Sequence, residues 1–196
     1  ILDKNIDAGP LEALIAQSPE AAQALEYVRA NPHQSTSFDY AAGSASARTL
    51  LSFIGHYESG NRNVIYNGGD GQPVDLANMT LDEVLDYQRE HVAAGYASSA
   101  ISPLQFIQDT LRETVESVPE ISGEDYMTPE VVERLGMELL ERRGLGAYLD
   151  GQMNVDDFIY NLSQEWASLP ENASGKSYYD GDGLNTAHAD YKELYA

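Results

Sequence analysis

The residue best placed to do chemistry is Glu58, a carboxylate at the end of an apolar helical stripe. Ile54, Tyr57 and Glu58 share one side of a helical pattern, which Gly60 and Asn61 then stop. Apolar neighbours and the negative end of the helix dipole both disfavour a charged carboxylate, so we expect the pKa of Glu58 to be raised. A protonated glutamate near neutral pH suits general acid catalysis at a glycosidic bond. The alternative is a glutamate that points into solvent and has no chemical role.

The segment that follows Glu58 predicts a loop or a short β hairpin. Residues 61–75 are rich in Asn, Gly and Asp, which favour turns. Asp70 and Asp75 are candidates for a second carboxylate, which would position a water molecule or attack an anomeric carbon. The alternative for both aspartates is turn formation alone.

Two later segments form a pattern with Glu58-Ser59-Gly60. The first is Ser98 to Ile107, which contains Gln105-Phe106, and the second is Glu165-Trp166-Ala167-Ser168-Leu169-Pro170. In this order they resemble phage lambda lysozyme and its relatives, which are peptidoglycan lytic enzymes of the lysozyme-like superfamily. The likeness runs from about Thr49 to Tyr195.

This resemblance implies a fold, an activity and a set of site residues. The implied fold is α+β and mostly α, a lysozyme-like domain with a small β or loop wing. The implied activity is cleavage of the β-1,4 bond between N-acetylmuramic acid and N-acetylglucosamine, with Glu58 as the general acid. The cleft beside Glu58 would then be lined by Ser59, Tyr66, Gln105, Phe106 and Trp166. Where relatives have Gly-Arg-Tyr or Gly-Leu-Met before the glutamine, this chain has Ser102-Pro103-Leu104.

The resemblance leaves two chemical endings and one non-enzymatic alternative open. The enzyme is expected to be either a muramidase, with Asp70 or Asp75 as second carboxylate, or a lytic transglycosylase, in which the muramic acid's own 6-hydroxyl closes on C1. It would be a phage endolysin or virion-associated, working in the virion or the host periplasm and cell wall on peptidoglycan glycan strands. The alternative is a non-catalytic structural or wall-binding virion module that keeps the lysozyme frame.

A polar loop near the C-terminus adds three candidate binding residues. Residues 170–185 contain Tyr178 and Tyr179, which could stack on sugar rings, and Lys176, which could meet a peptide-stem or lactyl carboxylate. Asp180-Gly181-Asp182-Gly183 in the same loop does not continue as an EF-hand, because Leu184 and Tyr191 occupy ligand positions. We therefore expect no metal site and no cofactor.

Local signals predict the helices that must position these residues. Thr80 opens a capping box with Glu83, Thr128-Pro129 opens another helix, and Asn154 caps a third. Arg142-Arg143 at the end of the second helix suits its dipole without a ligand. The remaining expectations are a central helix from about Ser46 to Ser59, a helix from Pro103 that carries Leu104, Ile107 and Leu111 inward, a turn over 145–151 and a final helix over 187–195.

Length, composition and charge limit the possible domain organisation and the possible partners. With 196 residues and 42% hydrophobic content, the chain can bury the core of one domain, and it contains no cysteine. We expect an N-terminal helical extension and linker over 1–45, which would contact other virion or phage proteins, and the lysozyme-like domain over 46–196. A net charge of −21 argues against nucleic-acid binding and would also repel an anionic cell wall at low salt. No signal peptide and no membrane span are visible.

Overall fold

The computed structural model describes residues 40–183 and 185–195. This part of the chain is mostly helical with one small antiparallel sheet, which confirms the α+β, mostly α class. Most of the predicted N-terminal extension lies outside the described residues. The elements are α3 (Tyr40–Ser59), β1 (Val64–Ile65), β2 (Gln72–Pro73), η1 (Leu76–Asn78), α4 (Leu81–Ala93), α5 (Gln108–Ser117), α6 (Pro129–Arg142), α7 (Leu145–Leu149), α8 (Val155–Ser163) and η2 (Glu193–Tyr195).

Three helices begin where the sequence predicts. The Thr80 hydroxyl accepts a hydrogen bond from the Glu83 N–H, and the Glu83 carboxylate accepts one from the Thr80 N–H, which completes the capping box of α4. Thr128 caps α6 ahead of a proline at its start, and the Asn154 side chain caps α8. These caps satisfy backbone N–H groups that have no partner inside the helix.

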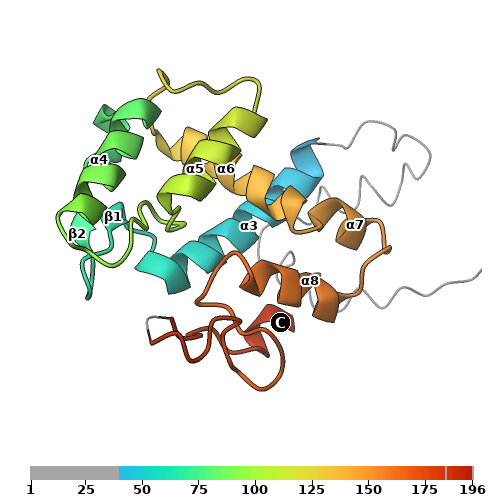
Figure 1. Cartoon of the computed structure of the whole chain (residues 1–196). Coiled ribbons are helices and arrows are strands. Elements are labelled where there is room, and N and C mark those ends of the chain that lie inside the picture. Colours follow the sequence, from blue (N-terminus) through green and yellow to red (C-terminus); the bar gives the residue numbers. More distant parts are fainter. Residues whose placement is uncertain (1–39, 184, 196) are drawn as a thin grey trace, which may run out of the picture.

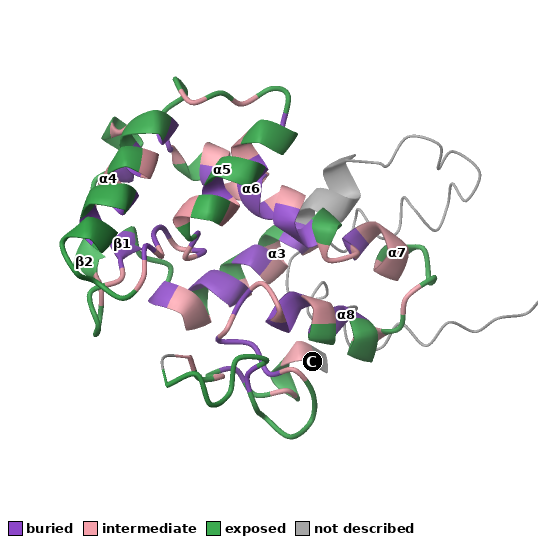
Figure 2. Cartoon of the chain, in the orientation of Figure 1, coloured by how far each residue is buried: buried purple, intermediate pink, exposed green. Residues whose placement is uncertain are grey.

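Helices α3 and α6 form the centre of the domain. They pack against each other, and α6 also contacts α5 and α7 (Figure 1). A Cβ atom at Gly136 of α6 would lie 2.6 Å from a methyl carbon of Leu104 and 3.0 Å from the methyl carbons of Leu51 on α3. The missing side chain therefore lets α6 approach α3 closely. Figure 2 shows that the buried residues of both helices face this shared core.

The remaining elements lie on opposite sides of α3. The hairpin of β1 and β2, in which Val64 lies opposite Pro73, sits with α4 on one side. Helices α7 and α8 and the C-terminal segment lie on the other side (Figure 1). The C-terminal end of α3, which carries Glu58, therefore lies between the hairpin and the C-terminal segment.

Two predicted boundaries near α3 and Pro103 are wrong. Helix α3 begins at Tyr40, six residues before the predicted Ser46, because the alanine-rich stretch 41–47 favours a helix over the predicted connector. No helix starts at Pro103, since Ser102 and Gln105 have left-handed φ angles of +77° and +52°. Ile101 pairs with Phe106 and with Ile65 of β1 instead, and α5 begins only at Gln108.

Two other predicted elements also differ. The predicted turn over 145–151 contains the short helix α7, which buried Leu145 anchors to the core. The predicted final helix over 187–195 is reduced to the 3₁₀ turn η2. The N–H groups of His188 and Ala189 both donate to the Ser168 carbonyl, so these hydrogen bonds fix this part of the chain in an irregular conformation. No helix among the described residues is long and apolar enough to cross a bilayer.

Candidate functional site

A cleft of about 1000 Å³ opens beside the C-terminal end of α3. Its lining comes from segments far apart in the sequence: the end of α3 and the hairpin, the turn before α5, the ends of α5 and α6, and residues 164–168 with 185–188. Of the candidate site residues named from the sequence, those that line it are Glu58, Ser59, Tyr66, Asp70, Gln105, Phe106, Trp166 and Tyr179. The fold therefore brings the three quoted motifs to one place.

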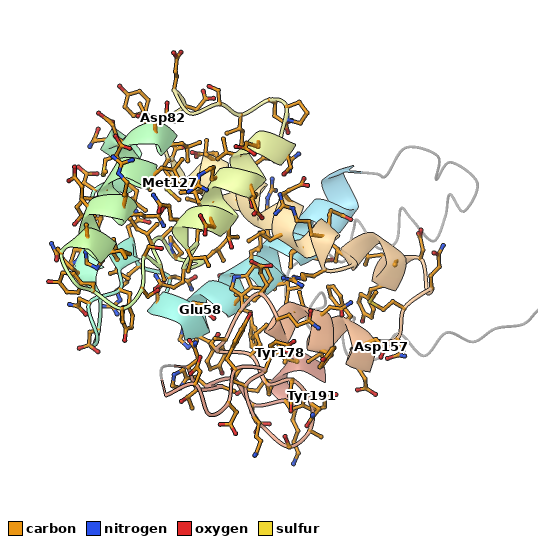
Figure 3. The ribbon with its side chains drawn as sticks, in the orientation of Figure 1. Glu58, Asp82, Met127, Asp157, Tyr178 and Tyr191 are labelled. Carbon is orange, nitrogen blue, oxygen red and sulfur yellow. The ribbon has the colours of Figure 1, made fainter. Side chains whose placement is uncertain are left out.

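Glu58 is a partly buried carboxylate in the wall of this cleft (Figure 3). Its Oε1 accepts a hydrogen bond of 3.1 Å from the Ser168 N–H. Burial raises the pKa of Glu58, and this effect outweighs the Ser168 contacts and the charge of His188, which act in the opposite direction. The Ser168 N–H makes this contact, because the buried Ser168 hydroxyl has no hydrogen-bond partner among the described residues. The predicted direction of the pKa shift is confirmed.

The chain reverses directly after Glu58, and Ser59 fastens this turn. Helix α3 ends with the Gly60 N–H on the His56 carbonyl, at 3.0 Å, and Gly60 adopts a φ of +68°. The buried Ser59 hydroxyl lies 3.1 Å from the carbonyl oxygen of Pro103, to which it donates, and accepts from the Arg62 N–H. Ser59 therefore ties the helix end to the turn that carries Gln105.

Gln105 lies in that turn and not at a helix start. Its side-chain amide donates to the Ser102 carbonyl at 2.7 Å. The turn is held from behind by Gln88 of α4, which is fully buried and whose amide donates to the carbonyls of Ser99 and Phe106, both at 2.8 Å. The position of Gln105 in the cleft therefore depends on tertiary hydrogen bonds.

Trp166 and Phe106 belong to both the core and the cleft. Each is 2% exposed, and each contributes to the lining. The indole N–H of Trp166 donates to the Leu104 carbonyl at 3.2 Å. Trp166 is therefore a core residue and also part of the cleft lining.

The two candidate second carboxylates are separated by the structure. Asp70 is exposed and lines the cleft. Asp75 is not part of the lining, and its carboxylate accepts a hydrogen bond of 2.7 Å from Asn78 at the start of η1. Tyr66 lines the cleft from the hairpin, where its carbonyl lies 2.5 Å from Nε2 of His91. The structure thus favours for Asp75 the turn chemistry that was its alternative.

The C-terminal loop contributes only one of its three predicted residues. Tyr179 lines the cleft and donates its hydroxyl to the Gln164 carbonyl at 2.6 Å. Tyr178 packs edge-to-face on Tyr179 and is 45% exposed, but it is not part of the cleft lining. Lys176 also lies outside the lining, and its ammonium group is 3.3 Å from the Asp180 carboxylate.

Sequence reasoning missed most of the charged lining. Arg62, Arg142 and Arg143 all line the cleft. Arg143 makes a partly buried ion pair of 2.7 Å with Glu165, and Arg142 donates to the Glu113 carbonyl at 2.9 Å. The helix dipole already explained the two consecutive arginines at the end of α6, so nothing in the sequence gave a reason to expect them in the cleft lining. The sequence signal that could have indicated a charged cleft wall is Glu165, because its carboxylate stands directly before Trp166 in the quoted motif.

Comparisons with known proteins and a search of the described residues for metal-binding groups assign no family and no metal to this site. No protein-family model matches the chain, and neither does a curated protein or a solved structure. Within residues 40–183 and 185–195, no group of three or more His, Asp or Glu side chains is placed to hold a metal ion. The resemblance to phage lambda lysozyme therefore stays a prediction that depends on the motifs.

Proposed function

We propose that this protein is a lysozyme-like peptidoglycan lytic enzyme that cleaves the bond between N-acetylmuramic acid and N-acetylglucosamine. The observation that carries the proposal is Glu58, a partly buried carboxylate with a raised pKa in the wall of a large cleft. A raised pKa favours the protonated form of the glutamate, and this form can protonate the bridging oxygen as the sugar becomes oxocarbenium-like. A volume of about 1000 Å³ lies at the upper end of ordinary ligand sites and suits a segment of polymer.

The contact with Ser168 defines which oxygen of Glu58 delivers the proton. Oε1 accepts the hydrogen bond from the Ser168 N–H, so the proton of the neutral acid resides on Oε2. After proton transfer, the same N–H stabilises the carboxylate. The Ser168 contact thus favours the charged form of Glu58, whereas burial favours the neutral form and has the larger effect on the pKa.

Two endings of the reaction fit this arrangement. In a muramidase, Asp70 would position the attacking water or attack C1, since it is the candidate second carboxylate that lines the cleft. In a lytic transglycosylase, deprotonated Glu58 would take the proton of the 6-hydroxyl of muramic acid, which then closes on C1. Mass spectrometry of the digested wall separates them, because the 1,6-anhydro product is lighter by one water than the hydrolytic product.

The second candidate is a wall-binding or structural virion module without catalysis. Two observations favour it: the net charge of −21 and the replacement of the expected residues before Gln105 by Ser102-Pro103-Leu104. Incubation of purified peptidoglycan with the protein decides between the candidates. The enzyme releases soluble muropeptides, whereas the module sediments with the wall and releases nothing. Either form fits a place in the virion or in the host periplasm and cell wall.

A further inference from the structure

Arg62 differs from nearly every other described cation in having no carboxylate partner. The described residues include nine Lys and Arg, and seven of them have a carboxylate oxygen within 4.0 Å. The two without one are Arg62 and Lys192, and of these Arg62 lines the cleft. In a chain with 32 acidic residues and 11 Lys and Arg, an unneutralised guanidinium in the candidate site needs an explanation.

The guanidinium group of Arg62 is held in place by backbone carbonyls. Nε donates to the Ser59 carbonyl at 2.8 Å, and Nη2 donates to the Asp70 carbonyl at 2.9 Å. Both acceptors are neutral, so they orient the group without cancelling its charge. A guanidinium has five N–H donors, and these two bonds occupy Nε and one hydrogen of Nη2, while no hydrogen bond of Nη1 is found among the described residues. The edge formed by Nη1 and Nη2 is left for a bidentate acceptor.

The position of Arg62 relates this edge to Glu58. Arg62 is fastened to Ser59, the residue after Glu58, and its N–H also donates to the Ser59 hydroxyl. A substrate group held by Arg62 therefore lies close to the bond that Glu58 would cleave. Acidic groups also line the cleft, and an anionic substrate meets a net charge of −21. A local cation is the element that offsets this repulsion.

We propose that the Nη1 and Nη2 edge of Arg62 binds a carboxylate of the peptidoglycan substrate, which rests on the proposed function. The sugar rings of the glycan are uncharged, so the carboxylate belongs to the peptide stem or, in strands without peptides, to the lactyl group of muramic acid. Arg62 then makes the enzyme selective for carboxylate-bearing strands. It takes the role that the sequence suggested for Lys176, whose charge is offset by Asp180 outside the cleft.

The test compares Arg62→Gln with the wild type on three forms of the same peptidoglycan. One is untreated, one has its carboxylates converted to amides, and one has its peptides removed by an amidase. Hydrogen bonds to charged groups are among the stronger ones, so the variant should need about 10-fold more untreated substrate for half-maximal rate, which corresponds to about 1.4 kcal/mol. On the amidated form, the two proteins should behave alike. A defect on the untreated form identifies a stem carboxylate, because the lactyl group is amide-linked to the peptide there, and a defect on peptide-free strands shows that Arg62 also binds the lactyl carboxylate that the amidase frees.

Controls separate binding from folding and from catalysis. Lys192→Gln removes the same charge from the other cation without a carboxylate partner, outside the cleft, and should leave all three rates unchanged. Sedimentation of Glu58→Gln and of Glu58→Gln/Arg62→Gln with untreated and amidated wall measures binding without turnover. The proposal is overturned if Arg62→Gln weakens cleavage and binding equally on untreated and amidated wall, because this indicates a structural role. It is also overturned if the substitution weakens neither. If the wild type cleaves none of the substrates, the proposed function has failed instead.

Discussion

Replacing Glu58 with Gln should stabilise the fold at high pH but not at low pH. Burial raises the pKa of Glu58 above its ordinary value of 4.5, so the folded state binds this proton more tightly than the unfolded state. The contribution of Glu58 to stability is therefore fully present below pH 4.5 and is lost as pH rises through the folded pKa. Gln carries no charge and keeps an oxygen that can accept the Ser168 N–H, so it avoids this loss.

The size of the effect follows from one proton. Between the unfolded and folded pKa values of Glu58, the stability difference between variant and wild type should grow by at most about 1.4 kcal/mol per pH unit. Above the folded pKa the difference should become constant. Each kcal/mol corresponds to about 2–4 °C in Tm for a domain of this size. The plateau therefore measures how far burial outweighs the hydrogen bond from Ser168.

Thermal unfolding of both proteins from pH 4 to pH 9, followed by circular dichroism, measures this difference. Glu90→Gln serves as the control, because Glu90 is an exposed residue of α4 and its replacement changes the net charge by the same amount. Its stability relative to wild type should change little over the same range. A Glu58→Gln curve that runs parallel to that of the wild type, or a wild type that is the more stable at pH 8, would refute the reasoning about burial.

Two further variants test how the cleft is built. Thr80→Ala removes the capping hydroxyl of α4, and its calorimetric stability should fall by about 1 kcal/mol with no change in wall lysis; a large loss of lysis would contradict a purely structural role. Gln88→Ala leaves the Ser99 carbonyl without its donor and the Phe106 carbonyl with only the Ile101 N–H, so urea unfolding should show a loss of about 1–3 kcal/mol, and lysis should fall because the turn that carries Gln105 loosens. Unchanged lysis by a folded Gln88→Ala protein would show that Gln105 does not depend on this support.

Local chemistry made some features predictable from the sequence. The caps at Thr80, Thr128 and Asn154 depend on residues within three positions of each other, so sequence spacing was sufficient. The pKa direction of Glu58 was predictable for a similar reason. Its place at the end of an apolar helical stripe already implied burial, although the predicted contribution of the helix dipole is not among the causes found in the structure.

Features that depend on tertiary contacts were not predictable. Pro103 looked like a helix start, but the pairing of Ile101 with Phe106 and Ile65 requires left-handed backbone around it. Arg62 gave no signal, because its position depends on a hairpin that brings the Asp70 carbonyl near the end of α3. The ion pair of Lys176 and Asp180 is different, because these residues are only four positions apart and their pairing could have been predicted from the sequence.

The central claim is that Glu58 transfers a proton to the glycosidic oxygen. The most direct test is the amount of soluble muropeptide released from purified peptidoglycan by the wild type, by Glu58→Gln and by Glu113→Gln, a control for an exposed carboxylate of the same cleft. Loss of a general acid lowers a rate by about 10²–10⁴-fold, so release by Glu58→Gln should fall by that factor while Glu113→Gln stays close to the wild type. Equal release by Glu58→Gln and the wild type, with both proteins folded, would contradict the account.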